Sequence, residues 1–228
     1  MHFTRSSSTI FRWSAYLLGL LILALGISMN TKAGLGVSPI ISVSFSVSSI
    51  WSHNFGNITL VLYTCFILVE VVLHSMLLRR GKLPGGMGRT ILLLDALQFP
   101  LSLVFTRFLN WFSVWLPDLP TDCLGTFWGT LPGQVVFLAF AIVFTGIGAA
   151  LSLNMRLIPN PGDGIVQAIS DFSGKSVGLT KNCFDITNVA ITTSIGLLST
   201  GHLVGIGLGT ILSMIGVGRV IALFNHLC

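Results

Sequence analysis

The stretch IISVSFSVSSIW, residues 40–51, decides how the rest of the chain is interpreted. From Ser42 to Ser48 serine occupies every second position, a pattern typical of a β-strand with two different faces. The surrounding sequence, however, indicates membrane-spanning helices. A lone strand inside a bilayer would leave its backbone N–H and C=O groups unpaired. We therefore predict a short helix that begins at Pro39.

The composition of the whole chain is that of a membrane protein. Of 228 residues, 53% are hydrophobic and only 8% are charged, and the mean hydropathy is +0.89. Soluble domains carry roughly 25% charged residues. The 12 Lys and Arg outnumber the 7 Asp and Glu, but they form no basic cluster with interleaved aromatic side chains. We expect no nucleic-acid partner and assign the basic residues to the cytoplasmic side of a lipid bilayer.

The sequence lacks the motifs of the common enzyme and metal sites. Its four cysteines show neither CxxC nor Cys/His ligand spacing: Cys65, Cys123, Cys183 and Cys228. No HExxH, Ser-His-Asp arrangement or GxxxxGK[ST] motif occurs. We therefore expect no enzymatic activity, no metal site and no cofactor, and any ATP-driven role would need a partner protein.

Long apolar runs predict six transmembrane helices, because a span needs about 20 apolar residues. They cover about 11–29, 58–78, 90–108, 133–153, 180–200 and 203–224. The stretch 109–132, rich in Pro, Gly and Trp and free of Lys and Arg, is predicted to be an extracytoplasmic loop. Basic residues near the span ends place both termini in the cytoplasm: Arg5, Arg12, Arg79, Arg80, Lys82 and Arg89.

The chain also repeats itself. LALGISMN at 23–30 matches GAALSLN at 148–154, and LGVSP at 35–39 matches LIPNP at 157–161. These matches occur in the same order and at nearly the same offset, which indicates a duplication. In the second half, the partner of the serine stretch has helical spacing.

We expect repeat one to cover 11–108 and repeat two to cover 133–224. Each repeat has three spans, and an odd number of spans turns the second repeat upside-down relative to the first. The predicted fold is an all-α integral membrane protein with six transmembrane helices in two inverted three-helix repeats. Each repeat carries a short re-entrant or broken helix, since twelve residues rise only about 18 Å against a hydrocarbon layer of about 30 Å.

Four motifs carry a family resemblance. They are K-A-x-L-G-x-x-P from Lys32, R-L-x-x-x-P-G-D-G from Arg156, LLLD in span three and GIGLGTIL in span six. Together they resemble the YitT/YczE family of bacterial integral membrane proteins over nearly the whole chain. The resemblance implies a multi-pass protein of the bacterial cytoplasmic (inner) membrane and a permease-like role without a defined substrate. It also implies an acidic position, which is Asp163 in the second half and is replaced by Ile41 in the first.

Polar residues at membrane depth are the default functional candidates, because burying them in lipid is costly. We expect substrate contacts from eight residues of the short helices and of spans three and five: Pro39, Ser42, Ser46, Asp95, Pro161, Asp163, Asp185 and Asn188. A second set is predicted to relay charge or protons: Lys32, Glu70, His74, Arg156 and Lys181.

Each of these assignments has a structural alternative. His74 either relays protons with Glu70 or extends toward the membrane surface. Lys181 and Asp185, four residues apart in span five, form either an internal ion pair or a substrate contact. Asp163 either caps a helix N-terminus or contributes its charge to a site. Glycines 205, 207, 209, 216 and 218 are predicted to form a packing face in span six.

These features favour a membrane transporter (permease) for a small solute or ion. We expect the substrate to bind where the two short helices meet, and access to alternate between the two sides of the membrane. Free N–H groups at the helix N-termini favour an anion, whereas Asp163 favours a cation or a zwitterion. The alternative is a non-transporting membrane scaffold or accessory subunit of a larger complex. The small size of the chain is compatible with a homodimer.

Overall fold

The described part of the chain is entirely helical. This computed structural model describes residues 9–81 and 88–227, so Arg5, Lys82 and Cys228 lie outside the described residues. The elements are α1 (Thr9–Lys32), α2 (Pro39–Ile50), α3 (Phe55–Arg79), α4 (Gly88–Trp115), α5 (Leu119–Asp122), the 3-10 turn η1 (Phe127–Gly129), α6 (Leu131–Asn154), α7 (Pro161–Ser173), α8 (Val177–Thr200) and α9 (Leu208–Leu227). No described residue is in a β-strand, which confirms the all-α prediction.

Five helices of the described chain are long and apolar enough to cross a membrane. They are α1, α3, α6, α9 and the helical stretch that includes α4. The sixth predicted span, 180–200, is helix α8, which has 24 residues but does not belong to this group of five. Its buried Asp185, Asn188 and Thr192, together with Lys181, lower its hydropathy. A multi-pass helical membrane protein follows, with five rather than six strongly apolar spans.

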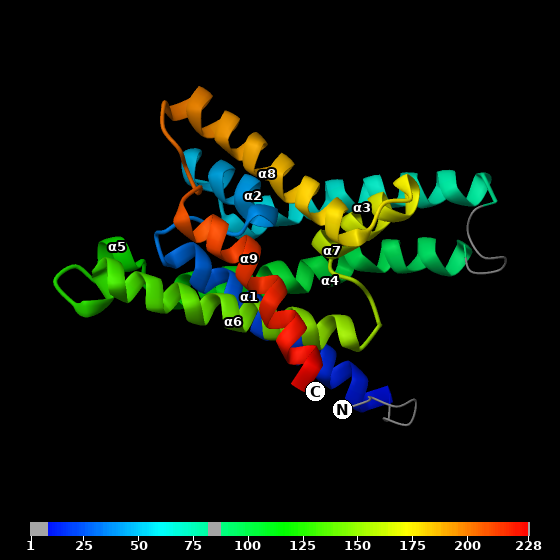
Figure 1. Cartoon of the computed structure of the whole chain (residues 1–228), viewed down its shortest axis with the longest axis horizontal. Helices are drawn as coiled ribbons and strands as arrows, with labels where there is room; N and C mark the ends of the chain where they lie inside the picture. The colour runs from blue at the N-terminus through cyan, green and yellow to red at the C-terminus, as the bar shows by residue number, and fades with distance from the viewer. Residues whose placement is uncertain (1–8, 82–87, 228) are drawn as a thin grey trace.

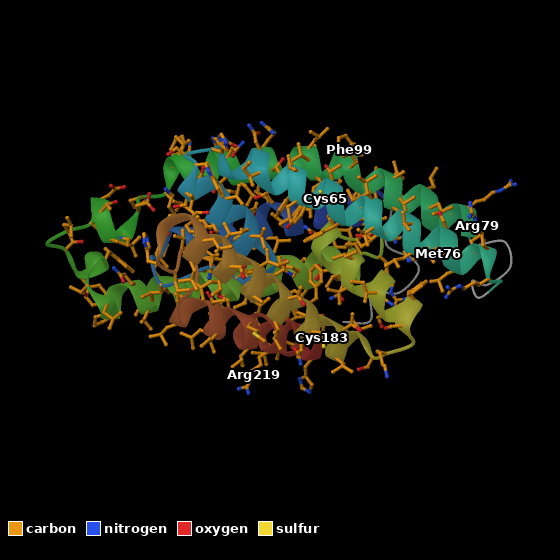
Figure 2. The ribbon with its side chains drawn as sticks, turned by 90° about the horizontal axis from the view of Figure 1, so that it is seen from above. Cys65, Met76, Arg79, Phe99, Cys183 and Arg219 are labelled. Atoms are coloured by element: carbon orange, nitrogen blue, oxygen red, sulfur yellow. The ribbon has the colours of Figure 1, made fainter. Side chains whose placement is uncertain are left out.

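The outer surface of the long helices carries large apolar side chains. Leu68, Val72 and Leu93 are 61%, 56% and 60% exposed, respectively. Met76 and Phe99 also lie on the outside of α3 and α4 (Figure 2). Such a continuous apolar surface is unusual for a monomeric protein in water, and it suits contact with lipid chains.

The serine stretch forms helix α2, as predicted. The four alternating serines of 42–48 are each no more than 6% exposed. At about 100° per residue, Ser42 and Ser44 point to nearly opposite sides of a helix. Ser42 Oγ lies 2.7 Å from Thr192 Oγ1 on α8, and Thr59 Oγ1 on α3 donates to Ser44 Oγ at 3.1 Å. The period of two therefore buries hydroxyls on both sides of α2, because α2 lies between α3 and α8.

The two short helices occupy corresponding places against the long ones. Helix α2 packs against α8 and α3, and helix α7 packs against α3 and α8. Figure 1 shows α2 along α8 and α7 along α3. Helix α4 packs against α3 and α1, and α9 packs against α6.

Helices α1 and α6 cross at glycines in the centre of the molecule. Gly19 lies against Gly148 and Ser152, and Gly26 lies against Thr145. Because lower-numbered positions of α1 meet higher-numbered positions of α6, the two helices are antiparallel. Small residues let the two backbones approach closely, as in other tightly packed membrane helices.

Two predicted boundaries differ from the structure. Helix α4 continues to Trp115, so the beginning of the predicted loop 109–132 is helical. The predicted sixth span begins at Leu208 rather than at 203. In the preceding segment, Gly205 O accepts a hydrogen bond from Val37 N at 2.9 Å.

The predicted packing face holds for Gly216, where a Cβ would lie 2.8 Å from Ile142 Cγ2 on α6, but other glycines of this set have different roles. Gly205 and Gly207 precede α9, and Gly207 lies against the carbonyl oxygen of Leu35. Gly209 N donates to the same oxygen at 2.7 Å. These glycines join two irregular backbone segments, whereas a Cβ at Gly218 would meet nothing within 4 Å.

Gly148→Ala tests the α1–α6 crossing, because the added Cβ would overlap the backbone nitrogen of Leu23. Overpacking costs about 1–3 kcal/mol. We expect a clearly lower melting temperature for this variant in detergent. Gly218→Ala is the matched control and should melt like the wild type, since its Cβ meets nothing within 4 Å. Equal melting of both variants would contradict the close crossing.

Candidate functional site

A cavity of about 80 Å³ lies where the N-terminal ends of α2 and α7 meet. Its wall includes Ser38 and Pro39 from α2 and Asn160 and Asp163 from α7. Each of these helices begins with proline, whose fixed φ suits the first helical position and which has no N–H to leave unpaired there. The two prolines therefore place both helix starts at the cavity.

Helix α8 contributes a charged pair to the cavity wall. Lys181 Nζ donates to Asp185 Oδ2 at 3.2 Å, and both residues line the cavity. The Asp185 side chain is only 2% exposed, and its Oδ1 atom is buried without a hydrogen-bond partner. The pair therefore leaves one acceptor of Asp185 unused.

Asp163 adds a second carboxylate beside this pair. Its charge interacts with those of Lys181 and Asp185. It is not the N-cap of α7, because Asn160 has that role and accepts from Gly162 N at 3.0 Å through Oδ1. This observation excludes the N-cap alternative for Asp163. The cavity wall thus holds two carboxylates against one ammonium group.

Sequence reasoning missed the neutral polar residues of the cavity wall. They are Ser38, Tyr63, Thr145, Asn160 and Ser213. The Tyr63 hydroxyl lies beside the Asn160 side chain and near Asp163.

A repeat offset was the signal that could have found several of them. An offset of 122 residues separates Pro39 from Pro161, and the same offset links lining residues of the two halves. These pairs are Ser38 and Asn160, Ile40 and Gly162, and Tyr63 and Asp185. A polar residue expected at the cavity in one half therefore indicates that the position 122 residues away also lines the cavity.

A second group of buried polar side chains lies between α3, α4 and α7. Gln98 Nε2 donates to Glu70 Oε2 at 2.6 Å, and His74 Nδ1 lies 2.8 Å from Asp95 Oδ2. All four residues are at most 7% exposed. A Cβ at Gly164, in the first turn of α7, would lie 2.7 Å from Glu70 Oε2. The glycine thus lets the Glu70 carboxylate reach the backbone of α7.

The structure divides the predicted substrate residues into three groups. Pro39, Asp163 and Asp185 line the cavity. Asp95 belongs instead to the group between α3 and α4. The remaining four are buried in the packing around the short helices without lining the cavity: Ser42, Ser46, Pro161 and Asn188.

The predicted relay residues are also separated. Lys181 lines the cavity, and Glu70 and His74 lie in the second buried group. Lys32 instead pairs with Asp118 at 2.7 Å, and Arg156 is exposed. Neither of these two basic residues lines the cavity. The described residues contain no group of three or more His, Cys, Asp or Glu side chains arranged to hold a metal ion.

The five apolar spans define a multi-pass helical membrane protein, and charged side chains line a cavity between its helices. Residues 10–226 match the family of unknown function DUF6198, and the chain belongs to that family. It is 24% identical over 213 residues to the uncharacterized membrane protein YczE of Bacillus subtilis (strain 168), which covers 93% of this chain and 84% of that protein. The resemblance to YczE-type membrane proteins is therefore confirmed. No solved structure matches the chain.

Lys181→Met tests the charged pair, because it leaves the buried carboxylate of Asp185 without its donor. An unsatisfied buried acceptor costs about 1–3 kcal/mol. We expect the free energy of unfolding in detergent to fall by about that amount, and Asp185→Asn to restore part of it in the double variant. Lys175→Met, at an exposed lysine without an ion pair, is the control. Equal stability of the two single variants would exclude a structural contribution from the pair.

Proposed function

We propose that this protein is a permease that moves a small solute or ion across the membrane by alternating access. The cavity between the first turns of α2 and α7 carries this proposal. Ionisable side chains inside membrane proteins are costly and commonly mark substrate pathways. Here Asp163, Asp185 and Lys181 line one cavity, and Asp185 Oδ1 still lacks a donor among the described residues.

The proposal includes an inverted repeat, with α1–α4 corresponding to α6–α9. The helix lengths are 24, 12, 25 and 28 residues in the first half and 24, 13, 24 and 20 in the second. Three further observations support it. Helices α1 and α6 cross antiparallel, each short helix packs on the long third helix of the other half, and lining residues recur at an offset of 122.

In this arrangement the C-terminal ends of α2 and α7 lie toward opposite sides of the membrane, and the two N-terminal ends lie near its middle. Helix α2 rises only about 18 Å over its twelve residues, too short to cross a hydrocarbon layer of about 30 Å. Their N-terminal ends then meet at the cavity. Substrate sites of inverted-repeat transporters are formed in the same way, by short or broken helices near the bilayer midplane.

The two halves also differ in a way that supports alternating access. Helices α3 and α4 pack together along the first half, whereas α9 has its main contacts with α6 rather than with α8. Figure 1 shows α8 and α9 separated from each other, with an extended segment joining the end of α8 to the start of α9. The third and fourth long helices are thus packed together in the first half and not in the second. Exchange of these two arrangements between the halves would expose the cavity to the opposite side of the membrane.

The cavity volume supports a small cargo. Pockets for drug-sized molecules measure about 300–1,000 Å³, whereas this cavity measures about 80 Å³. This volume has room for an inorganic ion or a few water molecules, since one water needs about 10–15 Å³ of such volume. A larger solute would require the α8–α9 side to open further.

Flux measurements in proteoliposomes test the transport proposal. We expect uptake above that of empty liposomes for at least one solute in a panel of monovalent cations, small anions and amino acids. Asp185→Asn should slow that uptake by at least about tenfold, because a hydrogen bond to a charged group contributes about 1.5–3 kcal/mol. Asp122→Asn, at an exposed position, should transport normally. Uptake equal to that of empty liposomes throughout the panel would favour the scaffold alternative.

Cysteine labelling tests the inverted arrangement. In a variant with its four native cysteines replaced by serine, His53→Cys marks the exposed C-terminal end of α2 and Lys175→Cys that of α7. We propose that both termini are cytoplasmic, so a membrane-impermeant maleimide added to intact cells should label only His53→Cys. Permeabilised cells should show labelling of both. Labelling of both positions in intact cells, or of neither, would contradict the arrangement.

A further inference from the structure

The buried group on α3 and α4 contains two acceptors that lack a donor. Glu70 Oε1 and Gln98 Oε1 are both buried and have no hydrogen-bond partner. Their residues are already joined through the other two polar atoms, since Gln98 Nε2 donates to Glu70 Oε2 at 2.6 Å. Leaving a buried acceptor unsatisfied costs about 1–3 kcal/mol, so two of them on one hydrogen-bonded pair of residues indicate a missing hydrogen.

We propose that Glu70 is a proton-binding site, and that a proton on Oε1 is donated to Gln98 Oε1. A carboxylic acid and a primary amide then pair through two hydrogen bonds that run in opposite directions, with the amide N–H to one carboxyl oxygen and the acid O–H to the amide oxygen. One proton supplies the donor that both unpaired acceptors lack. The proton is taken from water and returned to water, and no covalent bond of the protein changes.

The surroundings of Glu70 favour a proton over a bound metal ion. The described residues contain no group of three or more possible metal ligands. The nearest basic side chain, His74, has its Nδ1 atom 2.8 Å from Asp95 Oδ2 and is therefore already paired with a carboxylate. An ionised Glu70 would lack a counter-charge of its own in a site that is only 1% exposed.

The other charged groups that act on Glu70 come from α3 itself and from the helices packed against it. They are His74 on α3 itself, Asp95 on α4 and Asp163 on α7, with Asp171 of α7 acting on His74. Helix α2, which also packs on α3, has no titratable side chain. Two of the three direct neighbours are carboxylates, so a negative charge on Glu70 would be repelled by both.

The position of Glu70 connects this proton to the cavity. Its carboxylate contacts Gly164 in the first turn of α7, and the preceding residue, Asp163, lines the cavity. Release of the proton would place a negative charge beside that first turn and so change the field at the cavity. The proton thereby becomes the coupling ion of transport. This coupling rests on the proposed permease function, whereas the proton site itself does not.

Infrared spectroscopy of the full chain in proteoliposomes tests the proton site directly, because a protonated carboxyl group has a C=O band that a carboxylate lacks. We expect such a band in the wild type at neutral pH, with a frequency shift in D2O and loss of the band at high pH. Glu70→Gln should abolish the band and still fold, since two amides also pair with each other. Gln98→Leu should shift the band, because the acid loses its acceptor. Asp122→Asn, at an exposed position, should keep the band unchanged.

A carboxyl band that survives in Glu70→Gln, or a wild type without such a band while folded, would overturn the proposal. The coupling step is measured in proteoliposomes loaded with a pH-sensitive dye and given the panel solute that the wild type transports. The wild type should move protons with that solute, and Glu70→Gln should move the solute without protons. A carboxyl band from Glu70 without any transport would contradict the permease proposal and support the proton site. Transport without the band would support the permease proposal and contradict the proton site.

Discussion

A polar group inside a bilayer has no water to pair with, and the described structure depends on this constraint. Three of the four alternating serines of α2 satisfy it in two ways, whereas Ser46 Oγ is buried without a hydrogen-bond partner among the described residues. Ser44 Oγ and Ser48 Oγ donate to carbonyl oxygens one turn earlier, at 2.9 Å in each case, and Ser42 Oγ is also paired with Thr192 on α8. These pairings require α2 to be enclosed by other helices, which is why α8 and α3 flank it. The same contact explains Thr192 on the polar face of α8.

The sequence predicted those helix starts and acidic site residues that can be recognised from the residue itself and its neighbours in the chain. Pro39 and Pro161 start the two short helices as expected, because proline fixes the backbone at the first helical position. The carboxylates of Asp163 and Asp185 were also expected at a site, since an acid at membrane depth has few inexpensive positions. Tyr63 was not expected, because a single tyrosine in an apolar run resembles an ordinary core residue.

The positions of the basic residues could not be predicted from their distance to the prolines. Lys32 lies seven residues before Pro39, but Gly34 and Gly36 adopt φ values of +75° and +100° between them. These left-handed turns separate the direction of α1 from that of α2. Lys32 consequently points to Asp118 at the end of the molecule, where part of its charge remains hydrated. The spacing of Lys32 and Pro39 in the sequence does not predict this change of direction.

Under the proposed repeat, corresponding positions of the two halves differ in chemistry. Ser42 and Gly164 are 122 residues apart, and so are Glu70 and Thr192. Both contacts join the two halves: one is a hydroxyl pair, Ser42 with Thr192, and the other is a carboxylate against a glycine, Glu70 with Gly164. The same packing position therefore accepts either a neutral hydrogen bond or an acid, provided that the facing residue makes room. Under the proposed repeat, corresponding positions keep their packing but not their charge. Glu70 therefore lies in the packing of α3, and the charged side chains of the cavity wall come from α7 and α8.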